Sequence, residues 1–148
     1  MELSRLLPPS HVIVGLKGTS QRDIVRTLAE PLLEDQAISN LDDFVDNVLE
    51  REKIFTTQIM PDVAFPHAHC KQVKHISLVI GLAPEGLAFS PDTEDKCHLF
   101  FLIAVPTSEP EAHLELMANL VDFVMSDKLS QVLAATEPQQ ILDLLAKH

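Results

Sequence analysis

The sequence predicts an α/β protein, a three-layer α/β/α sandwich in which helices flank both faces of a mixed, roughly five-stranded sheet. Helix-type and strand-type segments are interspersed along the chain, which favours a layered architecture. Residues 99–105 are apolar on both faces, as expected for a central strand covered by helices on each side. The 148 residues, 46% of them hydrophobic, suffice for one buried core. We therefore expect a single domain over residues 1–148.

The first half of this domain is predicted to contain a strand and two helices. Residues 11–16 form a short β-branched run after two prolines. Ser20 and Asp23 have the spacing of a capping box, and residues 39–42 repeat that start signal. Apolar residues then recur at helical period: Ile24, Val25, Leu28, Leu32 and Leu33 in the first helix, and Leu41, Phe44, Val45, Val48 and Leu49 in the second. We expect both helices between residues 20 and 51.

The middle of the chain changes to extended structure. Residues 63–65, 76–82 and 99–105 are apolar, β-rich and bounded by Pro, Gly or Asp clusters, which is typical of strands. Residues 83–96 contain two prolines, a glycine and four acidic residues. This composition predicts a surface excursion with a short strand near residues 87–89.

The last third is predicted to be helical. The segment Ser108-Glu109-Pro110-Glu111 has the residues that open a helix. The buried face of this helix is expected to consist of Leu114, Met117, Leu120, Val121 and Val124. Two shorter helices, over residues 128–135 and 138–146, complete the predicted fold.

Composition excludes several classes of function. The net charge of -11 argues against binding to a phosphate backbone, which needs clustered Lys and Arg. The absence of Trp and Tyr leaves few stacking platforms for bases. No apolar run is long enough to cross a bilayer, so no membrane insertion is expected. Two cysteines are too few for a disulfide framework, which favours the reducing cytoplasm.

The candidate chemistry centres on His67. The residue before a proline is pushed towards extended geometry, so Pro66 should present His67 at a defined angle at the rim of the sheet. The pKa of an imidazole group lies near neutral pH, and its neutral form can act as a nucleophile. Arg51, at the end of the second predicted helix, can supply a permanently charged donor. His113 falls in the first turn of a helix, where negative charge is favoured.

These residues also carry a family resemblance. The order Arg51-Glu52-Lys53, Thr56-Thr57, Val63-Ala64-Phe65-Pro66-His67 and Glu111-Ala112-His113-Leu114 resembles the type 2 enzyme IIA domains of the sugar phosphotransferase system. This is the fructose, mannitol and nitrogen-regulatory branch, and the similarity covers nearly the whole chain. It implies a phosphotransferase component with a phosphohistidine intermediate.

The resemblance assigns a role to each site residue. His67 would accept a phosphoryl group from the histidine phosphocarrier protein and pass it to an enzyme IIB domain, or use it as a signal to a regulated protein. His113 and Arg51 would stabilise the phosphoryl group. A hydroxyl group of Thr56 or Thr57 can add a phosphate contact, and no cofactor or metal is required.

One loop departs from the family pattern. The family has Thr-Gly-Ile-Gly-Asn-Gly before its histidine motif, whereas this chain has Thr57-Gln58-Ile59-Met60-Pro61-Asp62, and Ala68 replaces the glycine after the histidine. We expect a stiffer loop without the positive φ angles that glycine permits. Asp62 would disfavour a nearby anion if its carboxylate pointed inward. The alternative to a phosphocarrier is therefore a non-catalytic regulatory or binding module on the same scaffold.

A third interpretation is a metal-dependent hydrolase, because His69, Cys70 and His75 closely follow His67. A tetrahedral site needs four well-spaced ligands, and no Cys-x-x-Cys pair is present. We therefore expect no metal site and place these three residues on the surface or in a loop. Cys97 is expected to be a small buried hydrophobic residue.

Overall fold

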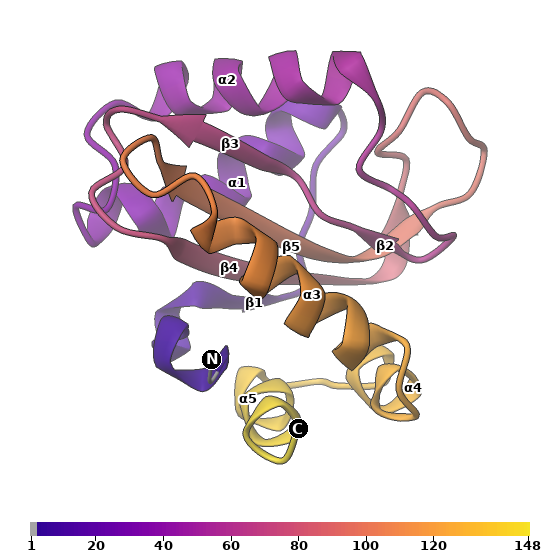
Figure 1. Ribbon diagram of the computed structural model, residues 1–148. Helices are drawn as coiled ribbons and strands as arrows, with labels where there is room; N and C mark the ends of the chain where they lie inside the picture. Colours follow the sequence, from indigo (N-terminus) through magenta and orange to yellow (C-terminus); the bar gives the residue numbers. More distant parts are fainter. Residues whose placement is uncertain (1–2) are drawn as a thin grey trace.

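The computed structural model describes residues 3–148, so Met1 and Glu2 of the predicted domain lie outside the described residues. Figure 1 shows three layers, with α1 and α2 on one face of the sheet and α3, α4 and α5 on the other, beside the start of the chain. The helices are α1 (Gln21–Glu34), α2 (Leu41–Ile54), α3 (Ala112–Val124), α4 (Lys128–Leu133) and α5 (Pro138–Ala146), with short 3₁₀ turns at Leu3–Leu6 and Pro9–His11.

The central sheet has five strands: β1 (Val12–Val14), β2 (Val63–Ala64), β3 (His67–Cys70), β4 (Ser77–Leu87) and β5 (Cys97–Pro106). Its order is β1-β4-β5-β2, and β3 also pairs with β5. The β4–β5 pair is antiparallel, whereas β1 runs parallel to β4 and both β2 and β3 run parallel to β5. The predicted mixed sheet between two helical layers is therefore confirmed.

One edge of the sheet is shared by β2 and β3. Val63 pairs with Leu99 and His67 pairs with Ile103, so both strands follow β5 in the same direction. Pro66 interrupts them because it has no N–H to donate, while its carbonyl accepts a hydrogen bond from Ile103 N at 3.0 Å. Strand pairing beyond this proline was not predicted, and it places His67 at the first position of an edge strand.

Strand β5 carries the core on both of its faces. Phe100, Leu102 and Ala104 belong to the apolar cluster under α1 and α2. The intervening residues of β5, Phe101, Ile103 and Val105, belong to the cluster under α3 and α5. Alternate side chains of a strand point to opposite faces, so the apolar run of β5 is buried on both faces of the sheet, as predicted.

A side chain caps each of the first two helices, at Ser20 as predicted and at Asn40, one residue after the start of the predicted signal at residues 39–42. Ser20 Oγ accepts a hydrogen bond from Asp23 N at 3.1 Å, and Asn40 Oδ1 accepts one from Asp43 N at 3.0 Å. These bonds satisfy backbone N–H groups that have no partner within the helix. They mark where α1 and α2 begin.

Several local predictions were wrong. Leu114 is 62% exposed and Leu33 is 38% exposed. The buried stripe of α3 contains Leu116 and Phe123 together with the predicted Leu120 and Val124, because residues three and four apart share a helix face. No separate strand forms at residues 87–89, since β4 continues to Leu87 beyond an irregularity.

Within the described part of the chain, no helix combines the length and the apolar character needed to cross a membrane.

Candidate functional site

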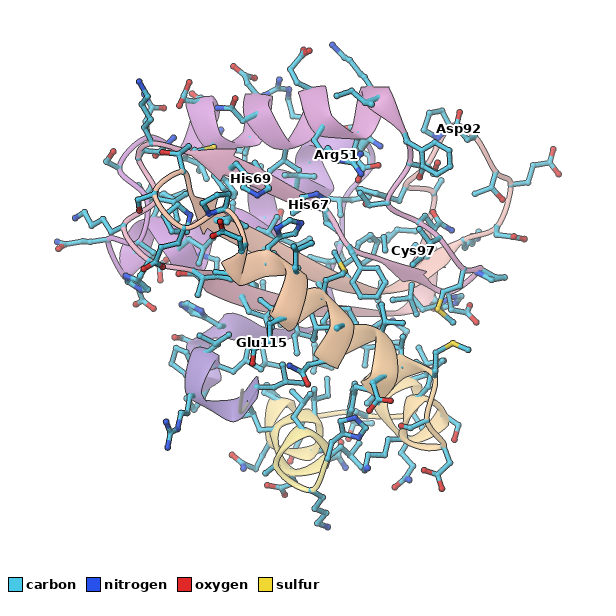
Figure 2. The ribbon with its side chains drawn as sticks, viewed as in Figure 1. Arg51, His67, His69, Asp92, Cys97 and Glu115 are labelled. Carbon is cyan, nitrogen blue, oxygen red and sulfur yellow. The ribbon has the colours of Figure 1, made fainter. Side chains whose placement is uncertain are left out.

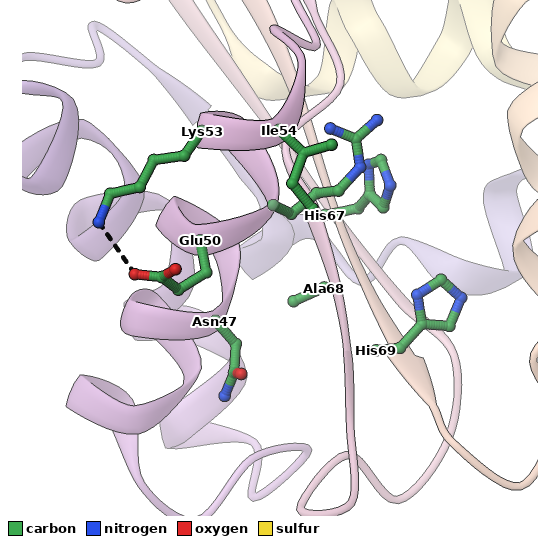
Figure 3. Close-up of a pocket in the computed structure, with 8 residues that line it drawn as sticks. Asn47, Glu50, Lys53, Ile54, His67, Ala68 and His69 are labelled. Carbon is green, nitrogen blue, oxygen red and sulfur yellow. Dashed lines mark hydrogen bonds and ion pairs between the residues drawn. The ribbon is translucent and has the colours of Figure 1, made fainter.

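A hollow lies where the C-terminal half of α2 passes over the edge strand β3. Figure 3 shows side chains from both elements around it. Its lining residues are Asn47, Glu50, Arg51, Lys53 and Ile54 from α2, and His67, Ala68 and His69 from β3. Because β3 is an edge strand, residues of α2 can reach past it towards the opposite face of the sheet.

His67 is held in one orientation at the start of β3. Its side chain is largely covered, with the residue 8% exposed, and its Nδ1 lies 2.9 Å from the Phe65 carbonyl oxygen. A carbonyl only accepts hydrogen bonds, so Nδ1 carries the proton and Nε2 of the neutral ring has a free lone pair. Burial lowers the pKa of His67, and the nearby charges of Arg51 and His113 lower it further. Neutral His67 is therefore the favoured form.

His113 faces His67 from the N-terminal end of α3. The two rings are nearly parallel, with centroids 5.6 Å apart and an angle of 22° between their planes. His113 Nδ1 lies 3.0 Å from the Pro110 carbonyl oxygen, which leaves Nε2 as the free nitrogen of the neutral ring. The N–H groups of Ala112 and Leu114 bond to carbonyls of the preceding turn, so they are not free for an anion.

Arg51 reaches the same hollow from the last turn of α2. Figure 2 shows its side chain above His67, between α2 and β3. Arg51 Nη1 donates a hydrogen bond to the Phe55 carbonyl oxygen at 2.7 Å, which orients the guanidinium. The structure thus brings Arg51, His67 and His113 together, although their roles in phosphoryl transfer remain predictions.

The two threonines of the predicted site have partners within their own segment. Thr57 donates both its hydroxyl and its backbone N–H to the buried carboxyl group of Glu52, and Thr56 Oγ1 accepts a hydrogen bond from Gln58 N at 3.1 Å. Burial raises the pKa of Glu52, while the two hydrogen bonds from Thr57 oppose the rise. Sequence reasoning missed Glu52, and a phosphate contact from either threonine remains a prediction.

His69 was considered from the sequence only as a metal ligand and was expected at the surface or in a loop. It lies in β3, exposed, with its ring edge-on to that of His113 at a centroid distance of 4.7 Å. The alternating pattern His67-Ala68-His69 was the available signal, because strand residues two apart share a face. Cys70 was also misplaced: it is buried in β3, and burial raises the pKa of its thiol to about 11.

The glycine-poor loop before β2 is held away from His67. Gln58 Nε2 donates to the carbonyl oxygens of Pro61 and Asp95, at 3.1 and 3.0 Å. Asp62 lies beside the start of β5, with its carboxylate 2.9 Å from His98 Nδ1. His67 pairs with Ile103, five residues further along β5, or about 16 Å at the usual strand rise. The Asp62 carboxylate therefore points away from the phosphoryl site that the sequence predicts.

The clustered imidazoles raise the question of a metal. Over residues 3–148, no three or more His, Cys, Asp or Glu side chains are arranged to hold a metal ion. Cys97 is fully buried at the start of β5, and burial raises the pKa of its thiol. Both cysteines therefore pack as small apolar side chains.

Comparison with known families gives one match over almost the whole chain. Residues 5–148 match the model for "Phosphoenolpyruvate-dependent sugar phosphotransferase system, EIIA 2". The match covers every helix and strand that surrounds the hollow, from β1 to α5.

Individual relatives are distant in sequence, but their matches extend over nearly the whole of this chain. The fructose-specific EIIA component of Haloferax volcanii is 24% identical over 147 residues, which cover 99% of this chain and 96% of that protein. The fructose-specific EIIABC component of Bacillus subtilis is 22% identical, and this chain spans 24% of its length. In the solved complex of enzyme IIA and phosphorylated enzyme IIB for mannitol from Escherichia coli, the matched chain has a TM-score of 0.81 at 23% identity, covering 96% of this chain and 98% of that one.

Proposed function

Because this chain belongs to the EIIA 2 family of the phosphoenolpyruvate-dependent sugar phosphotransferase system, we propose that it is a phosphocarrier that accepts a phosphoryl group on His67. The observation that carries the proposal is the hydrogen bond from His67 Nδ1–H to the Phe65 carbonyl oxygen. It leaves the Nε2 lone pair on a ring that lines a hollow shared with Arg51.

The transfer step is a displacement at phosphorus. The His67 Nε2 lone pair attacks the phosphorus of a phosphohistidine on the donor protein, and a new N–P bond forms as the donor's N–P bond breaks. The bonding electrons of the broken bond return to the donor ring. His67 keeps its Nδ1 proton, and the positive charge that develops on its ring is stabilised by the Phe65 carbonyl oxygen 2.9 Å away. The reverse displacement passes the group to the next acceptor.

Two neighbours stabilise the phosphoryl oxygens. The Arg51 guanidinium has five N–H donors, so it can bind phosphoryl oxygens while Nη1 stays on the Phe55 carbonyl. His113 donates Nδ1–H to the Pro110 carbonyl, and once protonated it also offers Nε2–H towards the group on His67. Phosphoryl transfer depends mainly on such positioning and charge stabilisation, so this chemistry is sufficient for the protein's part.

The proposed partners are the phosphorylated histidine phosphocarrier protein as donor and an enzyme IIB domain, or a regulated protein, as acceptor. The mannitol enzyme IIA of similar fold was solved in complex with a phosphorylated enzyme IIB, which supports the second partner. Fructose-specific relatives support a role in sugar uptake through a cytoplasmic phosphoryl chain.

The non-catalytic binding module is not favoured. That alternative depended on the glycine-poor loop, and its main concern was the Asp62 carboxylate near the acceptor. Asp62 instead lies beside His98, about five strand positions from His67. Arg51 and His67 line one hollow and the His113 ring lies against that of His67, so the altered loop does not argue for loss of transfer.

The decisive experiment is to incubate the protein with the phosphorylated histidine phosphocarrier protein and map the label by mass spectrometry. We expect one acid-labile phosphoryl group on the peptide that contains His67. The label should be lost in His67→Ala and kept in His75→Ala, a matched control because His75 is an exposed histidine of the loop after β3.

Label that persists on His67→Ala would assign the phosphoryl group to another residue. A wild-type protein that stays unlabelled, while a known enzyme IIA is labelled under the same conditions, would contradict the phosphocarrier function itself.

A further inference from the structure

His69 lies beside His67 on the face of β3 that looks towards α3. Ala68 and Cys70, the residues on either side of it in β3, belong to the cluster under α1 and α2. Phe65, two positions before His67, belongs to the opposite cluster, so His67 and His69 emerge on the α3 side of the sheet. His69 is exposed to solvent while His67 is buried, and both line the same hollow.

The three imidazole rings form one contiguous group. His69 is edge-on to His113, with centroids 4.7 Å apart and planes at 89°. His67 and His113 lie 5.6 Å apart, and His67 and His69 lie 6.3 Å apart. The Pro110 carbonyl oxygen binds His113 Nδ1 at 3.0 Å and also favours a proton on His69. A phosphoryl group on His67 would therefore have two further imidazoles beside it.

Before phosphorylation, the charged residues that line the hollow provide, among the residues that the structure describes, no unpaired carboxylate that could stabilise a protonated His69. From α2, Arg51 and Lys53 are cationic, and the one carboxylate of that helix in the lining, Glu50, is paired with Lys53 at 2.9 Å. From β5, the residues opposite β3 are Ile103, Ala104, Val105 and Pro106, which carry no charge. Glu109 and Glu111 flank Pro110 in the turn before α3, where both are exposed and neither lines the hollow. Burial and the charge of His113 lower the pKa of His69 in the unphosphorylated state.

We propose that His69 is a third imidazole of the phosphoryl site, which takes up a proton from solvent when His67 is phosphorylated and then donates a hydrogen bond to the phosphoryl oxygens. This proposal rests on the proposed function. Before phosphorylation, a proton on His69 is disfavoured by burial and by the charge of His113. A phosphoryl dianion on His67 reverses the sign of the local charge, which favours the protonated form of a neighbouring imidazole.

The consequence is a linkage between phosphorylation and pH. If the phosphorylated state binds an additional proton, mildly acidic conditions stabilise that state relative to the unphosphorylated one. Because protonated His69 holds the phosphoryl oxygens in the phosphorylated ground state, we also expect the phosphohistidine of this chain to persist longer at mildly acidic pH than it would with a residue at position 69 that cannot take up a proton.

The experiment uses phosphoramidate as the donor, so that partner docking plays no part. In this reaction His67 Nε2 forms the N–P bond and ammonia leaves. Wild-type protein, His69→Gln, His69→Phe and the control His75→Gln are phosphorylated, and the gain of one phosphoryl group is followed by intact mass. The titration of each imidazole is followed by nitrogen-15 NMR, and hydrolysis of the phosphohistidine is timed from mildly acidic to mildly alkaline pH.

We expect His69 to titrate at higher pH in the phosphorylated protein than in the unphosphorylated one. Hydrolysis at mildly acidic pH should be about tenfold faster in both His69 variants than in wild type and the His75→Gln control, as expected for losing one charge-assisted hydrogen bond. His69→Phe keeps a ring against His113, so wild-type behaviour of that variant would show that His69 acts by packing alone and would overturn the proposal.

An unchanged His69 titration in a protein that is phosphorylated on His67 would also overturn the proposal, and it would leave the phosphocarrier function intact. A wild-type protein that gains no phosphoryl group from phosphoramidate would overturn both.

Discussion

The protonation of the His67 ring depends on one hydrogen bond and on burial. The Phe65 carbonyl oxygen fixes the proton on Nδ1, and burial of the ring disfavours a second proton. Desolvation penalises the charged form of an imidazole, so the pKa of His67 lies below its ordinary value of 6.5. The ring therefore remains a neutral nucleophile at pH values where an exposed histidine is already protonated.

This shift predicts a pH dependence of phosphorylation. As pH falls, the rate of phosphoryl uptake should decline with a midpoint below pH 6.5, because the neutral form is lost at the lowered pKa of His67. The measurement is the rate of uptake from phosphoramidate against pH, compared with the profile of N-acetylhistidine, which has no folded environment. An acidic limb centred at or above 6.5 would contradict the assigned environment of the ring.

The segment that joins α2 to β2 depends on one buried carboxyl group. Glu52, in the last turn of α2, accepts hydrogen bonds from the hydroxyl and the N–H of Thr57. The Thr57 carbonyl oxygen in turn accepts from Phe65 N at 3.1 Å. A single chain of hydrogen bonds therefore runs from the end of α2 to the residue whose carbonyl orients His67.

Glu52 should make the stability of the fold depend on pH. Its folded pKa is raised by burial, so between the ordinary value of 4.5 and that raised value the folded state binds more protons than the unfolded state. The free energy of unfolding contributed by this group is therefore highest at low pH and falls as pH rises through that window. Glu52→Gln cannot titrate and should remove this part of the pH dependence.

The test is urea unfolding of both proteins from about pH 4.5 to about pH 8, where the linkage is expected. Glu50→Gln is the matched control, because Glu50 lies in the same helix with its side chain 71% exposed. Parallel stability curves for wild type and Glu52→Gln would show that Glu52 does not titrate differently on folding.

The whole molecule is organised around β5, whose two faces carry both halves of the core. Phe101 is fully buried and stacks on Phe65, with ring centroids 5.3 Å apart. Phe65 also supplies the carbonyl that orients His67. The packing of the α3 side of the core therefore positions the ring of His67 as well as stabilising the fold.

We expect Phe101→Ala to lower the free energy of unfolding by about 3–5 kcal/mol, since it removes a large buried side chain and leaves a cavity. Leu114→Ala should change it by less than about 0.5 kcal/mol, because Leu114 is 62% exposed. Chemical denaturation of the two variants measures both values. Comparable losses would show that Leu114 is part of the core after all.

Sequence reasoning succeeded where a signal is local. The period of apolar residues located α1 and α2. Ser20 caps α1 as expected, and Asn40 caps α2 one residue after the predicted Ser39. The doubly apolar run of β5 indicated a central strand, and hence two helical layers. It was less successful for α3, where Leu114 was assigned to the buried face although the stripe begins at Leu116. A shift of two residues along a helix moves a side chain to nearly the opposite side, so small errors in phase reverse burial.

In the candidate site, too, the features with a local sequence signal were predicted and those that depend on distant residues were not. Pro66-His67 and the residues around His113 and Arg51 were recognisable from their order along the chain. The proposed contribution of His69 was not recognisable, because it depends on a ring contact with His113, 44 positions away. The burial of Glu52 was not recognisable either, because it depends on the packing around that side chain. The position of the Asp62 carboxylate beside His98, away from His67, was likewise decided by the pairing of the adjoining strand β2 with β5.

By itself, then, the sequence determined the layered architecture and the order of the reactive residues, since periodicity, capping and a proline act over a few neighbours. Only the tertiary structure decided which of those residues meet, which nitrogen of His67 is free, and which neighbouring charges surround it. Hydrogen bonding and desolvation depend on groups that are distant in sequence, so they exist only once β3, α2 and the start of α3 are packed together.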